Sequence, residues 1–487
     1  MVGALALVSL VLVGCQTSEP EPPRPPPGSR ASAVSPAVQD AVPPAVQDSA
    51  AVSERPSVLL VIVDTLRADR LPAYGFDWGK APNLGRLAAD SVVFERGIAA
   101  SAATIPSHAS MFTSRFVRQH SVGHNNGDTR LTDEATLAEY FRDAGYATAA
   151  FISNVMLNSA TGLGRGYELY DENLPVQEPN RPFFFERHAP NTTRRAIRWL
   201  ERQAEKPVFL TVHYQDPHGP YTPPERVLRA IPSRDRGLER RLPTNPTQSG
   251  LGGLPNYQAL PGVEFPGEYE ERYVAEILYM DRWLGLLLKA FDRHRPGAGH
   301  VVLFTSDHGE SLGENNHWFE HGHASSPDIA HIPFVLKAPG VEPERRTEPV
   351  SHVDVLPTLL ELSGVEVPDE VSGIALGPYL RNSRDLPARK LYCDLGIETG
   401  VYDESGWTRV RFPSYAAAAR GDMTEIRAES YAWSPESGWS QEATKAEVSG
   451  EAEGYFSAVK APRAVDRQLS PEEVKRLQAL GYLEPDE

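Results

Sequence analysis

The feature that most constrains the fold is the run Ser57–Val63, which is apolar after its first residue and rich in β-branched side chains. An uninterrupted apolar run of this length indicates a strand buried on both faces, as in a parallel sheet covered by helices. The run ends at Asp64, which places a carboxylate at the carboxyl end of the strand. Similar segments follow at Ala147–Ile152, Val208–Val212, Val301–Thr305 and Phe334–Leu336.

Helical patterns lie between these strand segments. The stretch Leu131–Ala144 has Thr132 near its start and Gly145 after its end, which predicts a capped helix. Apolar residues recur at helical spacing within Tyr269–Phe291, which predicts a long helix with one face in the core. The alternation predicts an α/β fold, a doubly wound and mostly parallel sheet with helices on both faces. Ligands of such sheets bind beyond the carboxyl ends of the strands.

Two parts are expected after the N-terminal region. Residues 56–365 are predicted to form a catalytic domain, and residues 366–487 a small C-terminal α+β subdomain. Short strands are expected at Leu391–Asp394, Trp407–Phe412 and Ser430–Trp433. Ser470 followed by Pro471 has the pattern of a helix start, so a last helix is expected from there.

The first 15 residues have the pattern of an export signal. The apolar run over residues 2–14 is shorter than the roughly 20 residues that a membrane-spanning helix needs. It ends in Leu-Val-Gly-Cys, which is similar to a bacterial lipobox, and this predicts a lipoprotein of the cell envelope, periplasmic or on the outer surface, anchored to the membrane at Cys15. A short hydrophobic anchor is the alternative. Residues 16–55 are rich in proline and alanine and predict a disordered tether.

The negative net charge of the chain argues against a nucleic-acid partner. The formal net charge is −17, whereas a nucleic-acid-binding protein has a basic surface. We therefore expect no nucleic-acid partner. The second cysteine, Cys393, is expected to be a small buried apolar residue, since two distant cysteines suggest neither a disulfide framework nor a cysteine metal site.

Three polar clusters adjoin the predicted elements. Asp64 follows the first strand, and the pair Asp307-His308 follows the strand Val301–Thr305. An adjacent carboxylate and imidazole can bind one divalent cation. Thr104 precedes Pro106, a residue typical of the first turn of a helix, where backbone amides favour an anion. Taken singly, each residue is better explained as a cap or a turn residue.

Together these clusters resemble the sulfatase branch of the alkaline phosphatase superfamily over about residues 56–365. Five motifs carry the resemblance: a first metal-binding strand, a nucleophile segment, a substrate-side histidine loop, a second metal segment and a downstream structural motif. In this chain they are Val61–Asp69, Thr104–Arg115, His213–Tyr221, Ser306–Glu310 with His321–Gly322, and His352–Leu360. Five motifs in the family's order are a specific signal, so the chain is identified as a member of this superfamily.

The resemblance implies roles for the matching residues. One divalent metal ion, Mn²⁺, Zn²⁺ or Ca²⁺, is expected, with a threonine that also acts as the nucleophile and forms a covalent ester. The alternative is a second ion, as in phosphatase relatives, for which Asp216, His218, His317, His321 and His323 are available. The implied ligands are Asp64, Thr104, Asp307 and His308. The implied catalytic histidines, which protonate the leaving group and bind the anion, are His218 and His321. The substrate-side candidates are His108, which stands in place of the family's usual arginine, Arg115 and Asn154.

Several positions depart from the sulfatase pattern. Sulfatases carry a cysteine or serine at the position of Thr104 and oxidise it to formylglycine, an aldehyde that threonine cannot yield. Thr65 stands where a second aspartate is usual, His308 where asparagine is usual, and Ser153-Asn154 where a Lys-x-His segment is expected. A threonine nucleophile with an Asp-His pair is similar to phosphodiesterases and to phosphoglycerol or phosphoethanolamine transferases. These departures favour phosphoryl chemistry.

Alternatives to this interpretation stay open from the sequence. They are hydrolysis of a sulfate ester, transfer of a phosphoryl headgroup, and a catalytically weak module that binds anionic glycans or lipids. The expected partner in every case is an anionic sulfate or phosphate ester, on a glycan or a lipid headgroup. An arginine-rich insertion over residues 226–241 suits such an anion, and a solvated loop is its alternative explanation.

Overall fold

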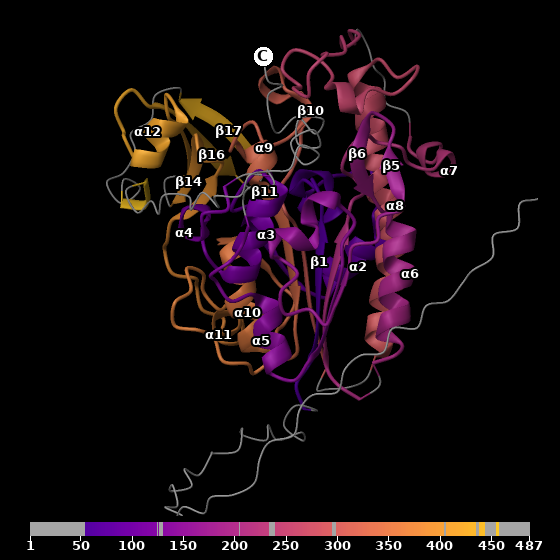
Figure 1. Cartoon of the computed structure of the whole chain (residues 1–487), viewed down its shortest axis with the longest axis vertical. Coiled ribbons are helices and arrows are strands. Elements are labelled where there is room, and N and C mark those ends of the chain that lie inside the picture. The colour runs from indigo at the N-terminus through magenta and orange to yellow at the C-terminus, as the bar shows by residue number, and fades with distance from the viewer. Residues whose placement is uncertain are drawn as a thin grey trace, which may run out of the picture. The chain divides into compact units, whose positions relative to one another are not determined.

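The computed structural model describes residues 54–456 except 124, 126–129, 204, 233–238, 295–298, 404–405, 435–437 and 444–453 (Figure 1). The export signal with Cys15, nearly all of the tether, and the helix expected from Ser470 lie outside the described residues. None of the helices in the described part of the chain is long and apolar enough to cross a membrane.

The core of the protein is an eight-stranded sheet with the order β12-β2-β11-β8-β1-β7-β3-β4. Strands β8, β1, β7, β3 and β4 are mutually parallel, and β11 runs antiparallel to both of its neighbours. The predicted α/β fold with a mostly parallel sheet is therefore confirmed. The strands are β1 (Ser57–Val63), β2 (Val92–Ile98), β3 (Ala147–Phe151), β4 (Leu169–Asp171), β7 (Val208–Tyr214), β8 (His300–Ser306), β11 (His331–Lys337) and β12 (Arg345–Ser351).

Alternate residues of β1 enter two separate cores, one on each face of the sheet. Val58, Leu60 and Ile62 pack on one face with residues of α3, α5 and α10. The residues between them pack on the other face with α2, α6 and α8, and the long α6 and α8 lie next to each other (Figure 1). The helices are α2 (Pro82–Ala89), α3 (Thr104–Thr113), α4 (Val117–His120), α5 (Leu137–Asp143), α6 (Ala189–Leu200), α7 (Glu225–Leu228), α8 (Pro266–Arg293), α9 (Pro327–Ala330), α10 (Val355–Leu362), α11 (Gly377–Arg381) and α12 (Tyr415–Arg420).

The helix predicted over Leu131–Ala144 is shorter than expected. Helix α5 begins at Leu137, and Thr136 rather than Thr132 is its N-cap. The Thr136 hydroxyl accepts from the Glu139 amide at 3.3 Å, and the Glu139 carboxylate accepts from the Thr136 amide at 2.9 Å. This reciprocal capping box satisfies two amides, which a cap at Thr132 could not do because Ala135 stands three residues after it.

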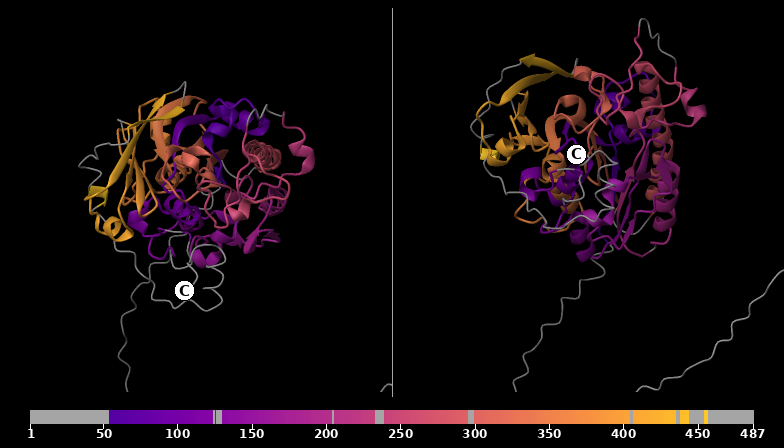
Figure 2. Two further views of the ribbon diagram at one scale, coloured as in Figure 1. Left: turned by 90° about the horizontal axis from the view of Figure 1, so that it is seen from above. Right: turned by 45° about the horizontal axis from the view of Figure 1, so that its top comes forward.

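A five-stranded antiparallel sheet forms the C-terminal part, with the order β13-β14-β15-β16-β17. Figure 2 shows this sheet, coloured yellow and orange, along one side of the larger part. It shares a hydrophobic core with Ala102 and Ala103 just before α3 and with Phe116 just before α4, and Arg118 of α4 donates to Asp394 at 2.6 Å. Cys393 is buried in this interface, as expected. The strands are β13 (Leu391–Asp394), β14 (Glu398–Asp403), β15 (Gly406–Arg411), β16 (Arg427–Ser434) and β17 (Gly438–Ala443).

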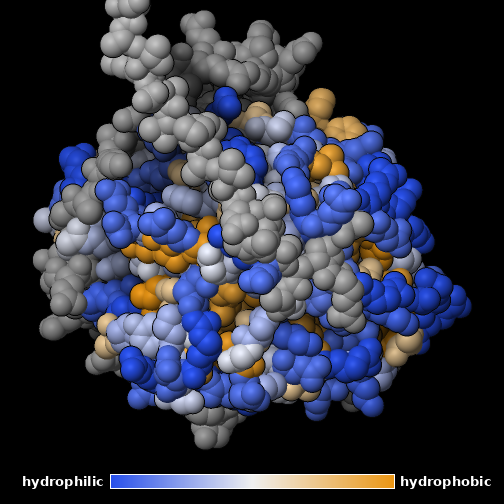
Figure 3. All heavy atoms as spheres, turned by 90° about the horizontal axis from the view of Figure 1, so that it is seen from below, coloured by the Kyte–Doolittle hydropathy of each residue, from blue (hydrophilic) through white to orange (hydrophobic). Residues whose placement is uncertain are grey.

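Short elements connect the larger ones. The hairpins are β5 (Val176–Glu178) with β6 (Arg181–Glu186), and β9 (Ser311–Leu312) with β10 (Trp318–Glu320). Single 3₁₀ turns precede or follow several helices and strands, including η3 (Val155–Leu157), η4 (Ser159–Thr161) and η6 (Glu314–Asn316). The face seen from below shows mainly hydrophilic side chains with smaller apolar areas between them (Figure 3).

Candidate active site

Two adjacent strands bring the predicted acidic residues together. β1 and β8 are parallel neighbours, and their last residues, Val63 and Ser306, are partners in the register. The residues that follow, Asp64 and Asp307, therefore meet at the carboxyl edge of the sheet. Both are fully buried, and together with His308 they offer three ligand atoms that lie within 4.8 Å of one another.

The hydroxyl of Thr104 lies in the same pocket. Thr104 is the first residue of α3, and its Oγ1 lies 3.4 Å from His308 Nε2. His308 Nδ1 donates to the Gly309 carbonyl at 3.0 Å, so its Nε2 carries the lone pair. The backbone amide of Ile105 lies in the first turn of α3, where amides have no acceptor within the helix. It donates to the side-chain oxygen of Asn125 at 2.8 Å.

Asn154 faces the acidic residues. Its amide group donates to Asp64 Oδ2 at 2.8 Å, and its side-chain oxygen accepts from the Met156 amide at 2.8 Å. The second contact caps the short turn η3, which fixes the side chain. Asn154 thus positions Asp64, whereas the sequence predicted a place on the substrate side.

Two further imidazoles line the pocket. His108 Nδ1 donates to the Thr104 carbonyl at 2.8 Å, one helical turn earlier. The rings of His108 and His213 have centroids 5.2 Å apart, and His213 Nε2 lies 3.6 Å from Asp64 Oδ2. His108, His213 and Asp307 form a second group of ligand atoms within 4.8 Å. His213 has no predicted role of its own, although a histidine within an apolar strand is a signal that points to such a position.

Burial changes the proton affinity of these groups. It raises the pKa of Asp64 well above its usual value and that of Asp307 to about 7. It lowers the pKa of both His108 and His308 to about 4, so both rings are neutral near pH 7. Burial disfavours the charged form of each group, and a positive ion in the pocket reverses that effect for the carboxylates.

The pocket contains buried polar atoms without hydrogen-bond partners, and these atoms are suitable ligands for a divalent cation. Among the described residues, several buried donor or acceptor atoms of the pocket have no hydrogen-bond partner. They are Asp64 Oδ1, Asp307 Oδ2, His108 Nε2 and both ring nitrogens of His213. Buried polar atoms are normally satisfied, and a mixed set of carboxylate oxygens and imidazole nitrogens suits a divalent transition metal.

The two predicted catalytic histidines, His218 and His321, lie next to each other and close to His308. The rings of His218 and His321 have centroids 5.1 Å apart, and that of His321 lies 4.5 Å from His308. His321 Nδ1 lies 3.0 Å from Glu310 Oε1, and Tyr221 donates to the other Glu310 oxygen at 3.0 Å. Burial raises the pKa of Glu310 to about 8 and lowers that of His321 to about 4. Glu310 is a functional candidate that the sequence placed in a motif without a role.

An aromatic ring packs against His218, and an arginine packs against that ring. The Phe184 ring stacks on His218 at 5.8 Å between centroids, and the Arg181 guanidinium lies 3.9 Å from the centroid of Phe184. Glu178 accepts two hydrogen bonds from Arg181, at 2.6 and 2.7 Å. Burial, then the charges of His321 and Arg181, lower the pKa of His218 well below its usual value.

The structure does not bring every candidate to this pocket. Arg115 lies beyond the far end of α3 and pairs with Glu370 at 3.0 Å. In the arginine-rich insertion, Arg234 and Arg236 lie outside the described residues. The other four arginines are exposed, and Arg241 pairs with Glu264 at 2.9 Å.

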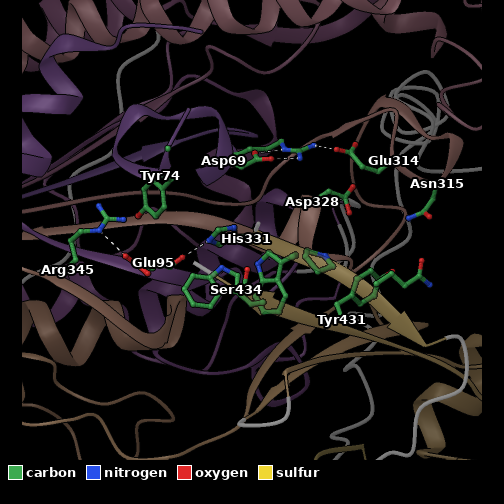
Figure 4. Close-up of a pocket in the computed structure, with 17 residues that line it drawn as sticks. Asp69, Tyr74, Glu95, Glu314, Asn315, Asp328, His331, Arg345, Tyr431 and Ser434 are labelled. Atoms are coloured by element: carbon green, nitrogen blue, oxygen red, sulfur yellow. Dashed lines mark hydrogen bonds and ion pairs between the residues drawn. The ribbon is translucent and has the colours of Figure 1, made fainter. Parts of the chain in front are cut away.

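A separate cleft of ≈ 740 Å³ lies between β11 and the C-terminal sheet (Figure 4). None of the predicted site residues lines it. Its charged side chains satisfy one another, as Arg67 does with Asp69 at 2.7 Å and Arg345 with Glu95 at 2.8 Å. The buried group around Thr104, with its unpartnered ligand atoms, is therefore the better candidate for catalysis.

Comparison with known proteins places the chain in a family. Residues 56–365 match the family model named Sulfatase, and the chain belongs to the sulfatase family within the alkaline phosphatase superfamily. The protein is therefore an ester hydrolase of that family. An uncharacterised sulfatase of Escherichia coli is 26% identical over 66% of this chain and 70% of its own length. Human iduronate 2-sulfatase is 27% identical over 64% of this chain and 70% of its own length.

Solved structures agree with the fold. The phosphonate monoester hydrolase of Agrobacterium radiobacter has a TM-score of 0.58 at 20% identity and covers 73% of this chain and 87% of its own. An enzyme in complex with its substrate D-glucosamine-2-N,6-O-disulfate has a TM-score of 0.60 at 19% identity and covers 77% of this chain and 91% of its own.

Proposed function

We propose that the protein is a metal-dependent hydrolase of sulfate or phosphate esters that uses Thr104 as its nucleophile. The observation that carries the proposal is the position of the Thr104 hydroxyl, 3.4 Å from His308 Nε2. This hydroxyl lies in a pocket whose carboxylate oxygens are buried without a partner among the described residues. A nucleophilic hydroxyl among potential cation ligands is the arrangement that such a reaction requires.

Asp64, Asp307 and His308 would hold the divalent cation, with Thr104 beside them. When bound, the ion lowers the pKa of the hydroxyl and neutralises negative charge that develops on the transferred group. Asn154 orients Asp64 through its 2.8 Å hydrogen bond. Because three imidazoles line the pocket, a transition metal such as Zn²⁺ or Mn²⁺ suits it better than Ca²⁺, which prefers oxygen ligands.

In the first step the Thr104 hydroxyl gives its proton to solvent water, and Thr104 Oγ1 attacks the central sulfur or phosphorus of the ester. The bond from that atom to the leaving oxygen breaks, and a covalent threonine ester forms. The leaving oxygen takes a proton from His321 Nε2, and the proton shared with Glu310 moves to His321 Nδ1. In the second step water attacks the threonine ester, the proton transfers run in reverse, and the free hydroxyl returns.

The threonine favours a phosphorus centre. Without an aldehyde hydrate, the threonine ester is released only by attack of water on the central atom. Phosphate and phosphonate esters are the substrates to which a plain hydroxyl nucleophile is suited. A sulfate ester is the second candidate, because relatives such as the human iduronate 2-sulfatase and an N-acetylglucosamine-6-O-sulfatase of Bacteroides thetaiotaomicron are sulfatases by name.

The test compares turnover of p-nitrophenyl sulfate, a phosphate monoester and a phosphodiester by the purified metal-loaded chain. Thr104→Ala is expected to lower kcat by more than about 10³-fold, since the nucleophile is gone. Thr113→Ala removes a buried threonine from the other end of α3, where its hydroxyl donates to the Ala109 carbonyl at 2.7 Å, and is expected to keep activity. Full activity in Thr104→Ala would contradict the proposal, and a clear preference for the sulfate would reverse the order of the two substrates.

The location of the protein is part of the same proposal. We expect lipidation at Cys15 and anchoring to the membrane of a bacterial envelope, where extended glycan or lipid esters are accessible. The support is the apolar run of residues 2–14 that ends at this cysteine. Cys15→Ser is expected to move the protein from the membrane fraction to the soluble fraction, and an unchanged membrane fraction would contradict the lipid anchor.

A further inference from the structure

A second group of potential metal ligands lies outside the Thr104 pocket, on the segment that leads from β9 to α9. His317, Glu320 and His323 each offer one ligand atom, and these atoms lie within 4.8 Å of one another. The two imidazole rings stack with centroids 3.8 Å apart and planes 10° from parallel. The side chains of His317 and His323 are 21% and 18% exposed, so water can reach the group.

The hydrogen bonds around His323 determine which ring nitrogen carries its proton. The Ser311 hydroxyl donates to Asp328 at 2.5 Å, so its oxygen accepts from His323 Nε2 at 3.4 Å. The proton of the neutral ring is then on Nε2, and Nδ1 carries a lone pair. This lone pair faces Glu320 Oε1 at 3.4 Å, and Nδ1 has no hydrogen-bond partner among the described residues.

Two acceptors that face each other repel, and a cation between them removes the repulsion. The same Glu320 oxygen also contacts His317 Nδ1, whose proton a metal ion would replace. The other Glu320 oxygen accepts from the Gly250 amide, which fixes the carboxylate.

Nearby positive charges are already balanced. Arg409 and Arg411 approach from β15 of the C-terminal sheet. Both donate to Glu398, at 2.8 and 3.1 Å. Arg409 also donates to Glu429 at 3.1 Å. Two carboxylates outside the group therefore compensate the two guanidinium charges, and Glu320 can compensate a bound cation.

We propose that His317, Glu320 and His323 form a second metal site, separate from the Thr104 pocket, that binds a transition-metal ion such as Zn²⁺. Two imidazoles and one carboxylate with access to water match the ligand set of an open zinc site. His321 lies between Glu320 and His323 in the chain, and its ring faces His308 in the pocket. An ion at this second site therefore holds the backbone on both sides of a histidine that lines the active site.

The test counts ions and requires no turnover, so it is independent of the proposed reaction. The full chain is stripped with a chelator and titrated with Zn²⁺, and bound metal is measured by elemental analysis. Wild type is expected to bind about one equivalent of Zn²⁺ more than His323→Ala. In His317→Ala the affinity for that equivalent is expected to fall by more than about tenfold. His188→Ala is the matched control, because His188 is half-exposed and lies 3.9 Å from both Glu186 and Asp216 without forming such a triad.

A second measurement separates the two sites. In an Asp64→Asn background, which removes a ligand of the pocket, Zn²⁺ is expected to raise the Tm, and adding His323→Ala is expected to abolish that rise. If His323→Ala fails to fold, as judged by circular dichroism, His323→Gln takes its place because it keeps a side chain that can donate to Ser311. Equal Zn²⁺ stoichiometry and affinity in wild type and in the His323 variant would overturn the proposal.

Discussion

The contact between Asn154 and Asp64 allows a sharp test of how the metal pocket is held together. Asn154 donates to Asp64 Oδ2 at 2.8 Å, and both side chains are buried. Burial raises the pKa of Asp64 well above its usual value, while this hydrogen bond opposes the rise. Removing the donor therefore makes Asp64 hold its proton more tightly, and a cation must compete with that proton.

The magnitude follows from the hydrogen bond. A bond to a charged acceptor contributes about 1.5–3 kcal/mol, and 1.4 kcal/mol corresponds to about a tenfold change in affinity. Asn154→Ala is therefore expected to weaken Zn²⁺ or Mn²⁺ binding by about 10- to 100-fold, the range typical when a partner of a metal ligand is lost. Isothermal titration calorimetry of the stripped protein measures this change.

Asn158→Ala is the matched control. Asn158 caps η4 as Asn154 caps η3, with its side-chain oxygen accepting from the Ala160 amide at 3.0 Å. Each substitution loses a cap, which costs about 1 kcal/mol of unfolding free energy, but only Asn154→Ala removes a donor to Asp64. If the two variants bind the metal equally well, the assignment of Asn154 as a positioning residue for Asp64 is wrong.

Three further predictions concern histidines and their partners. His213→Gln is expected to weaken Zn²⁺ binding more than Ca²⁺ binding, as measured by competition between the ions, because an imidazole near Asp64 is lost; a parallel loss for both ions would contradict this. Glu310→Gln is expected to slow esters with alkyl leaving groups more than p-nitrophenyl esters, because the proton relay to His321 is interrupted; equal effects on both would exclude the relay. Burial lowers the pKa of His120 to about 3, so its contribution to stability is present above the unfolded pKa of about 6.5 and is lost as the pH falls. Between pH 7 and 5 the free energy of unfolding is expected to fall by about 2 kcal/mol because of His120. Urea unfolding at several pH values is expected to show that His120→Gln lacks this part of the pH dependence.

The strand and helix pattern was readable from the sequence because it depends on local spacing. The run Ser57–Val63 became β1, and Asp64 stands at its carboxyl end as predicted. Thr104 begins α3, close to the position that Pro106 indicated. The predicted start of α5 is wrong because Thr132 is not its cap. Thr136 with Glu139 three residues later is the complete capping-box signal.

The type of fold and the motifs that hold the predicted nucleophile and acidic ligands could be read from local patterns, since each lies within a few residues of a recognisable strand end or helix start. How those motifs meet depends on the packing of the whole chain. Asn154 reaches Asp64 across 90 positions of the chain, and Thr104 reaches His308 across 204. The pairing of His108 with His213 likewise depends on the packing of α3 against the sheet. Such contacts follow from the order and register of strands that are distant in the chain, and no local pattern encodes them.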